Sequence, residues 1–277
     1  MRPPEDFDIR RHLQTRFPEF FLLLGKNSIN WRTVNKAYAR QASKYYERNH
    51  RTGKTFRIDP SIYSIITLSM QHDPEANRTF DYMKLLFMEL NESLSHNEKK
   101  LIVPALYGIL TNIDLKFRNF LGELSVLNLL KRQGYTLLET ERPLIESEPN
   151  GTKIDFHLKN TKTNQEHLVE IVNIKIDDKN TADDETITKL LNAKIVGKLL
   201  ETGIKRSNKF ILMPVVWGNW EYVLRLLAYF QTNNPTFANT ITPAALVPFT
   251  TETGELVHIF GTIDTIFVQP GGVKFTS

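Results

Sequence analysis

The sequence predicts an α/β fold of the α+β kind, a mixed sheet flanked by helices and preceded by an all-helical N-terminal region. Residues 1 to about 115 show helical spacing of apolar residues and no convincing strand. After them the pattern becomes helix, three strands, helix, strand and helix. The 277 residues, 41% of them hydrophobic, suffice for a core of this size. We therefore expect a helical region at 1–115 and an α/β domain at 116–277.

The composition excludes several classes of site. The chain has no cysteine, so disulfides, thiolate metal sites and a cysteine nucleophile are excluded, and a reducing, cytoplasmic compartment is expected. No zinc-type histidine spacing and no glycine-rich nucleotide loop occurs. The first residues lack the apolar core of a secretory signal, and no apolar run is long enough for a membrane span. The net charge of +4 only weakly favours a polyanionic partner.

The helical region divides into about four segments. The first runs over about 30–50, with Asn30 as its N-cap and a break at Gly53. The second begins after Asp59, where Pro60 suits the first turn. Two further amphipathic segments cover 78–95 and 95–114.

In the α/β region, a helix at 115–134 ends at Gly134, which suits a left-handed helix terminus. A later helix begins at Thr181, where three acids match the positive end of the helix dipole. The expected elements are helices at 115–134, 181–203 and 218–231, and strands at 135–144, 152–159, 167–176 and 209–217. Residues 235–277 read as further strands or a tail.

Two acids interrupt the apolar pattern of neighbouring strands. Asp155 lies on the polar side of strand 152–159, whereas Glu170 shares its side of strand 167–176 with Leu168 and Val172. A carboxylate on so apolar a face costs several kcal/mol unless it is compensated. A Mg²⁺ or Mn²⁺ ion held between the two acids would compensate it, and the hairpin spacing lets them lie side by side. The alternative is that Glu170 lies near a strand end or pairs with a lysine.

The order of elements, with Glu123 on the helix and Asp155 and Glu170 on the strands, resembles the PD-(D/E)xK nuclease superfamily over residues 115–230. The resemblance implies a restriction-endonuclease-like core that hydrolyses phosphodiester bonds of nucleic acid with Mg²⁺ or Mn²⁺. By position, Asp155 and Glu170 would be metal ligands and Glu123 an auxiliary one. The resemblance also implies a catalytic lysine two residues after the second acid.

That position holds Val172. Lys153, on the same side of its strand as Asp155, or Lys175, if a β-bulge turns it, would then join the two acids as a catalytic residue. Lys189 on the following helix is a further candidate. The alternative function is a catalytically inactive protein of nuclease fold that binds DNA or RNA or serves as an assembly module.

A row of basic residues four apart marks the first long helix, and helical geometry places them along one face. They are Arg32, Lys36, Arg40, Lys44 and Arg48. With tyrosines interleaved, this pattern is typical of a surface that binds a phosphate backbone, and DNA is favoured over RNA. The alternatives are a solvated face with the tyrosines packed inward, or a site for an acidic protein. By analogy with double-strand cutters of the superfamily, a homodimer is possible.

Overall fold

The computed structural model describes residues 8–52, 61–112, 116–143, 151–198, 210–218, 220–233, 244–250 and 256–262. The chain divides into two compact units, Met1–Asn128 and Leu129–Ser277. The first unit is built from helices, and the second is built around a sheet.

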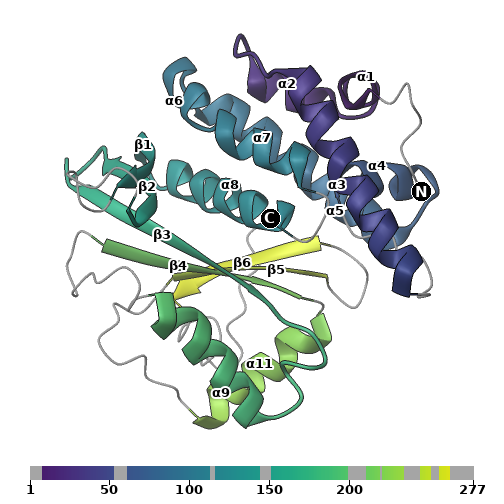
Figure 1. Cartoon of the computed structure of the whole chain (residues 1–277). Helices are drawn as coiled ribbons and strands as arrows, with labels where there is room; N and C mark the ends of the chain where they lie inside the picture. Colours follow the sequence, from purple (N-terminus) through teal and green to yellow (C-terminus); the bar gives the residue numbers. More distant parts are fainter. Residues whose placement is uncertain are drawn as a thin grey trace. The chain divides into compact units, whose positions relative to one another are not determined.

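The helices of the first unit are shown in Figure 1. They are α1 (Ile9–Arg16), α2 (Pro18–Leu24), α3 (Trp31–Thr52), α4 (Ile62–Met70), α5 (Pro74–Ser93), α6 (His96–Leu101), α7 (Val103–Thr111) and most of α8 (Phe117–Arg132). The predicted all-helical N-terminal region is confirmed. The four predicted segments begin only at about residue 30, so they do not include α1 and α2.

Side-chain caps explain where several of these helices begin. Asn30 accepts a hydrogen bond from the Thr33 N–H at 3.1 Å, as predicted. Ser61 forms a reciprocal capping box with Ser64 and starts α4. The predicted start after Asp59 lies outside the described residues.

The predicted single helix over 95–114 is wrong, because it forms two helices. Ser95 caps α6 in a capping box with Glu98, and α7 begins at Val103. Pro104 stands in the first turn of α7, where its missing N–H costs no helical hydrogen bond. Pro104, near the middle of the predicted segment, thus marks the start of a new helix.

Aromatic rings fill the core of the first unit. Phe17 lies 5.0 Å from Phe87 and 5.4 Å from Phe80, measured between ring centroids, and Phe20 lies 6.0 Å from Phe87. Phe17, Phe20 and Phe87 have no exposed surface. Burying such rings supplies the largest apolar area per residue, so they hold α1, α2 and α5 together.

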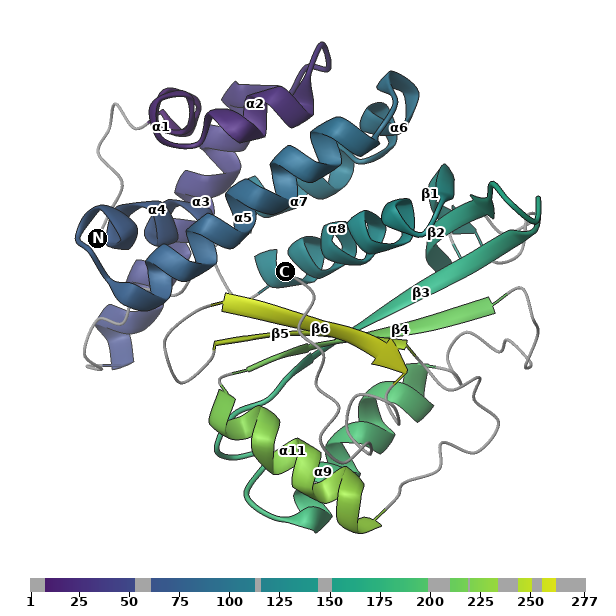
Figure 2. The same ribbon diagram turned by 180° about the vertical axis from the view of Figure 1, so that it is seen from behind.

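The second unit contains a six-stranded mixed sheet in the order β1-β2-β3-β4-β5-β6. The strands are β1 (Tyr135–Pro143), β2 (Lys153–Asn160), β3 (Glu166–Lys175), β4 (Phe210–Trp217), β5 (Ala244–Thr250) and β6 (Leu256–Thr262). The first three strands pair antiparallel, β3 to β5 pair parallel, and β6 is antiparallel to β5. Helices α9 (Asp184–Leu191) and α11 (Trp220–Asn233) lie on one face of the sheet (Figures 1 and 2).

The predicted fold class, a mixed sheet flanked by helices, is confirmed, and part of the region 235–277 supplies the last two strands. Gly134 follows α8 with φ +86°, as its role at the helix end requires. The predicted helix over 181–203 begins instead at Asp184, where the Asp183 carboxylate accepts a hydrogen bond from the Thr186 N–H. No described helix is long and apolar enough to cross a membrane.

Gly218 generates a stability prediction. It follows β4, where a Cβ atom would lie 2.8 Å from Cδ1 of the buried Ile176 and 3.3 Å from its carbonyl oxygen. Gly218→Ala should therefore lower the free energy of unfolding by about 1–3 kcal/mol, measured by urea denaturation. The matched control is Gly197→Ala on a helix, whose Cβ would meet nothing closer than 3.9 Å. The prediction is wrong if both variants behave alike.

Candidate active site

Asp155 and Glu170 occupy neighbouring positions on β2 and β3. Phe156 pairs with Val169 in the antiparallel register, and Asp155 and Glu170 are the next residues on the two strands. Because side chains alternate along a strand, both carboxylates lie on one face of the sheet. The expectation that the two acids lie next to each other therefore agrees with the register.

The two acids have different immediate partners. Glu170 is 1% exposed, and its Oε1 atom accepts from the Lys198 ammonium at 2.6 Å. Its Oε2 atom is buried and has no hydrogen-bond partner among the described residues. Asp155 accepts a hydrogen bond from the Ile171 N–H at 2.7 Å. Glu170 thus keeps one buried acceptor atom open toward a further donor or cation.

Burial disfavours the charged form of both acids. Burial, followed by the charge of Glu170, raises the pKa of Asp155 to about 7. Burial also raises the pKa of Glu170, which Lys198 partly opposes. The charge of Glu141 on β1 adds to both shifts. Two carboxylates held together at this energetic cost are characteristic of a functional site.

Lys198 reaches Glu170 from the helical segment that follows α9. Between α9 and Lys198 the backbone forms a π-helical turn, η1 (Asn192–Val196), and η1 lies against β3. A π-helical turn changes the direction in which later side chains point, and such turns are frequent at functional sites. Lys198 itself is about one third exposed. Its side chain therefore lies between the buried acid and the solvent.

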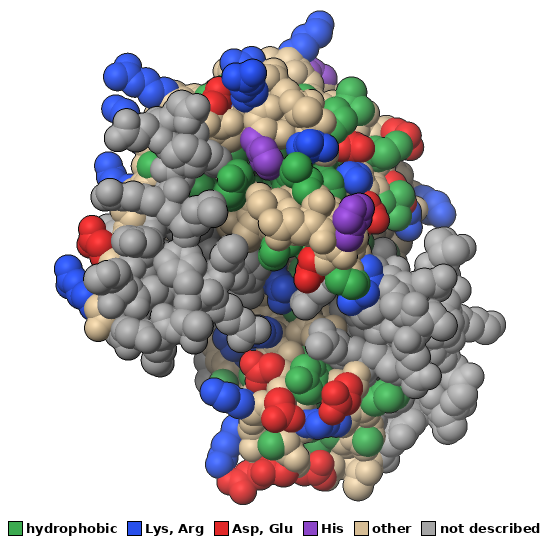
Figure 3. Space-filling model, turned by 90° about the vertical axis from the view of Figure 1, so that its right-hand side faces the viewer, with side chains coloured by type: hydrophobic (Ala, Val, Ile, Leu, Met, Phe, Trp, Pro, Cys, Tyr) green, Lys and Arg blue, Asp and Glu red, His purple; other side chains and the backbone are tan. Residues whose placement is uncertain are grey.

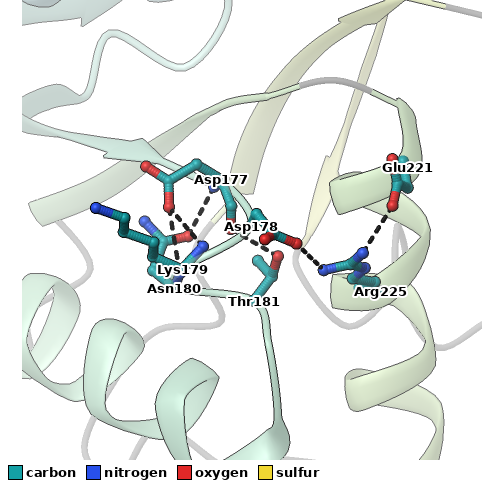
Figure 4. A network of polar contacts seen from close by, with 7 residues as sticks. All are labelled: Asp177, Asp178, Lys179, Asn180, Thr181, Glu221 and Arg225. Carbon is teal, nitrogen blue, oxygen red and sulfur yellow. Dashed lines mark hydrogen bonds and ion pairs between the residues drawn. The ribbon is translucent and has the colours of Figure 1, made fainter.

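A polar network fixes the connection from β3 to α9 (Figure 4). Asp177 accepts from the N–H groups of Lys179 and Asn180 and, through its carbonyl, from the Thr181 hydroxyl. The Asn180 side-chain oxygen in turn accepts a hydrogen bond from the Asp177 N–H at 2.8 Å. The loop is thus closed on itself by an Asx-type turn.

The same network ties this loop to α11. Arg225 donates to Asp178 at 2.9 Å and to Glu221 at 2.6 Å, and Figure 4 shows its guanidinium between the two carboxylates. Thr188 of α9 hydrogen-bonds with Tyr229 of α11 at 2.8 Å. These bonds hold α9, the helix that leads to Lys198, and the preceding loop against α11.

The pair has the donor chemistry of a hard divalent cation, since carboxylate oxygens are the preferred ligands of Mg²⁺ and Mn²⁺. Within the described part of the chain, no three or more histidine, aspartate or glutamate side chains are grouped as a metal site. Glu123 is half-buried on α8 and belongs to the first unit. Its role as an auxiliary ligand stays a prediction.

The lysines considered from the sequence are exposed, and their catalytic role stays a prediction. Lys153 is exposed at the start of β2. Lys175 is exposed and ion-pairs with Asp177 at 3.7 Å, and Lys189 ion-pairs with Glu185 on the surface of α9. Lys198 was missed, although it lies beyond α9 on the helical segment where Lys189 was considered. The sequence signal was a lysine between the apolar residues of "IVGKLL", in a helix expected to cover the sheet.

The basic row on α3 is exposed where it is described. Arg32, Lys36 and Arg40 are all exposed, and the side chains of Lys44 and Arg48 lie outside the described residues. Tyr38 packs inward, and burial raises its pKa to about 12. On the face shown in Figure 3, basic and acidic side chains are intermixed. Any binding of phosphate groups by α3 would therefore depend on these three basic residues rather than on the net charge of the protein.

Comparison with solved structures finds the SfsA protein of Pyrococcus furiosus, determined in complex with Ca²⁺. The match has 16% sequence identity, covers 53% of this chain and 64% of the SfsA chain, and has a TM-score of 0.22. It spans less than two thirds of SfsA, and so low a TM-score supports neither a shared site nor a shared activity. No protein-family model and no curated protein matches the chain.

The raised pKa of Asp155 generates a prediction for the metal-free protein. The folded value of about 7 exceeds the ordinary value of 3.8, so between these pH values the folded state binds the extra proton. The stability contributed by this group is complete below pH 4 and is lost as the pH rises through 7. Asp155→Asn, whose amide oxygen can still accept from Ile171, removes this dependence. In chelator, the free energy of unfolding of the variant relative to wild type should rise by about 1–4 kcal/mol between pH 4 and pH 8.

Urea titrations of both proteins across this pH range measure the difference. A difference that is constant with pH, or that shrinks as the pH rises, contradicts the raised pKa.

Proposed function

We propose that the chain is a nuclease that depends on a divalent metal ion and hydrolyses phosphodiester bonds of nucleic acid. The observation that carries this proposal is the buried pair of Asp155 and Glu170 together with the Lys198 ammonium at 2.6 Å from Glu170. Acid, acid and lysine are the residue types that the resemblance to PD-(D/E)xK nucleases calls for. Lys198 on a helix would take the place of the lysine missing at Val172.

The burial of the pair argues for a cation rather than for a purely structural role. A lysine can neutralise one carboxylate, but burial raises the pKa of both acids, and the charge of Glu170 raises that of Asp155 further. The buried Oε2 atom of Glu170, which has no described partner, would be a ligand together with Asp155. When bound, the ion would neutralise the pair, polarise the scissile phosphate and lower the pKa of a water molecule.

The chain's own groups have separable tasks in this proposal. Ile171 orients the Asp155 carboxylate through its N–H. Lys198 is held by Glu170 with part of its side chain in solvent, so its ammonium can donate hydrogen bonds to a phosphate oxygen on which negative charge develops. Hydrolysis then joins a water oxygen to phosphorus and breaks one P–O ester bond. The products are a phosphate monoester and a hydroxyl group.

The exposed basic residues of α3 favour a nucleic acid as the substrate. Arg32, Lys36 and Arg40 follow one another at single-turn spacing and are all exposed. Such a row matches the repeating negative charge of a phosphate backbone. Localisation in the cytoplasm and a homodimeric state stay expectations from the sequence.

A second candidate function is a catalytically inactive protein that binds DNA or RNA through α3. The observation that favours it is the presence of Val172 where the resemblance requires a lysine. In that case Lys198 and Glu170 are a buried ion pair that supports the fold. Such a protein needs no metal ion to bind.

The catalytic prediction concerns Lys198. Lys198→Met should lower the cleavage of labelled plasmid or single-stranded DNA in Mg²⁺ or Mn²⁺ by about 10²- to 10³-fold, because it removes a positioned hydrogen-bond donor. Asp155→Asn should abolish cleavage. Mn²⁺ binding by calorimetry should be lost in Asp155→Asn but kept in Lys198→Met.

Lys189→Met is the matched control, since Lys189 is exposed and ion-pairs within α9. It should cleave as the wild type does. Cleavage by Asp155→Asn at the wild-type rate would refute the site, and metal-independent binding without any cleavage would favour the second candidate.

A separate prediction tests α3. Reversing the charge of Lys36 and Arg40 to glutamate should weaken nucleic-acid binding and reduce the slope of log K against log salt concentration by about 2, roughly one per lost phosphate contact. Fluorescence anisotropy in chelator measures both quantities without cleavage. Charge reversal of Lys162, which is exposed in the turn between β2 and β3, should leave both the affinity and the slope nearly unchanged. An unchanged slope in the α3 variant would exclude this surface.

A further inference from the structure

A second polar cluster lies on the same face of the sheet as the acid pair. His157 follows Asp155 by two residues on β2 and pairs with Glu139 of β1 in the strand register. Its Nε2 atom lies 3.0 Å from Glu166 of β3, and its Nδ1 atom lies 2.8 Å from Nη1 of Arg142. The alternation of side chains places His157 on the side of Asp155, about 7 Å further along the strand.

Arg142 reaches this face against the alternation of β1. It pairs with the buried Ile154, so a regular strand would direct it to the opposite face. Its guanidinium nevertheless contacts His157 and lies 3.5 Å from Glu139. The residue before it, Glu141, has φ +53°, a left-handed conformation that is rare for a side chain other than glycine. This local turn of the backbone explains why Arg142 lies on the face of the acids.

The hydrogen bonds of His157 fix the guanidinium. An arginine can only donate, so Nδ1 of His157 accepts and the ring proton lies on Nε2, which donates to Glu166. The histidine side chain is 9% exposed, whereas the arginine side chain is 30% exposed. A buried histidine thus holds the guanidinium of a partly exposed arginine side chain at the edge strand of the sheet.

From this geometry we propose that Arg142 binds the phosphate adjacent to the scissile one in the nucleic-acid strand. Successive phosphates of a nucleic-acid strand lie about 7 Å apart. His157, which holds Arg142, lies about the same distance from Asp155 along β2. The planar fork of a guanidinium matches phosphate oxygens. Strained backbone conformations cluster at functional sites. Here the left-handed conformation of Glu141 places the Arg142 guanidinium on the sheet face that carries the two acids. The inference rests on the proposed nuclease function.

The test combines Arg142→Gln with substrates that carry one neutral methylphosphonate at a time, placed around a mapped cleavage site. On the all-phosphate strand we expect KM to rise about 10- to 100-fold with kcat largely kept, since this contact is equally strong in the ground state and the transition state. With the methylphosphonate at one position next to the cleaved bond, wild type and variant should cleave at similar rates. At all other positions the variant should stay slower.

A purely structural role of Arg142 predicts an equal loss on every substrate, and that result would overturn the inference while leaving the nuclease function intact. Arg142→Lys should recover part of the affinity and show the same dependence on the position of the methylphosphonate. Lys162→Gln should behave as the wild type does on every substrate. Thermal unfolding of each variant separates misfolding from lost contact. If the wild type cleaves no substrate in Mg²⁺ or Mn²⁺, the nuclease function and this inference fall together.

Discussion

The structure of the second unit depends on how it holds two carboxylates that repel each other side by side in its interior. Asp155 and Glu170 are brought together by the β2–β3 register, which apolar neighbours such as Phe156 and Val169 fix. Slipping the register by one residue would separate the acids but would also turn those apolar side chains to the wrong face. Core packing therefore holds together two groups that repel each other. The compensation comes from Lys198, which belongs to an element far along the chain.

The position of Lys198 depends in turn on polar contacts away from the acids. The β3–α9 loop is closed by Asp177 and Asn180 and fastened to α11 by Arg225. Each of these contacts contributes little to the free energy of folding, because it lies at the surface. Together they fix where α9 starts, and the π-helical turn then fixes where Lys198 points. Support for a buried ion pair is thus distributed over loop, helix and sheet.

Local periodicity made much of the fold predictable from the sequence. Alternation along β2 and β3 placed both acids within the sheet, and an apolar run identified β4. Asn30 and Gly134 marked helix ends through chemistry that acts within one turn. Prediction failed where the outcome depends on long-range packing. A π-helical turn changes the phase of later side chains without a composition of its own, so Lys198 could not be separated from Lys189. Likewise, no local preference of glutamate indicates the left-handed conformation of Glu141, which interrupts the two-residue period of β1.

The conformation of Glu141 also bears on self-association. As β1 is the first strand of the sheet, its outer N–H and C=O groups are those that another strand could join. A left-handed residue breaks the even spacing of these groups, the register shift between Leu137 and Glu139 breaks it again, and Pro143 at the end of β1 has no N–H to offer. The same distortion that turns Arg142 toward the acids therefore makes this border of the sheet a poor template for intermolecular β-pairing and protects the chain against aggregation through it.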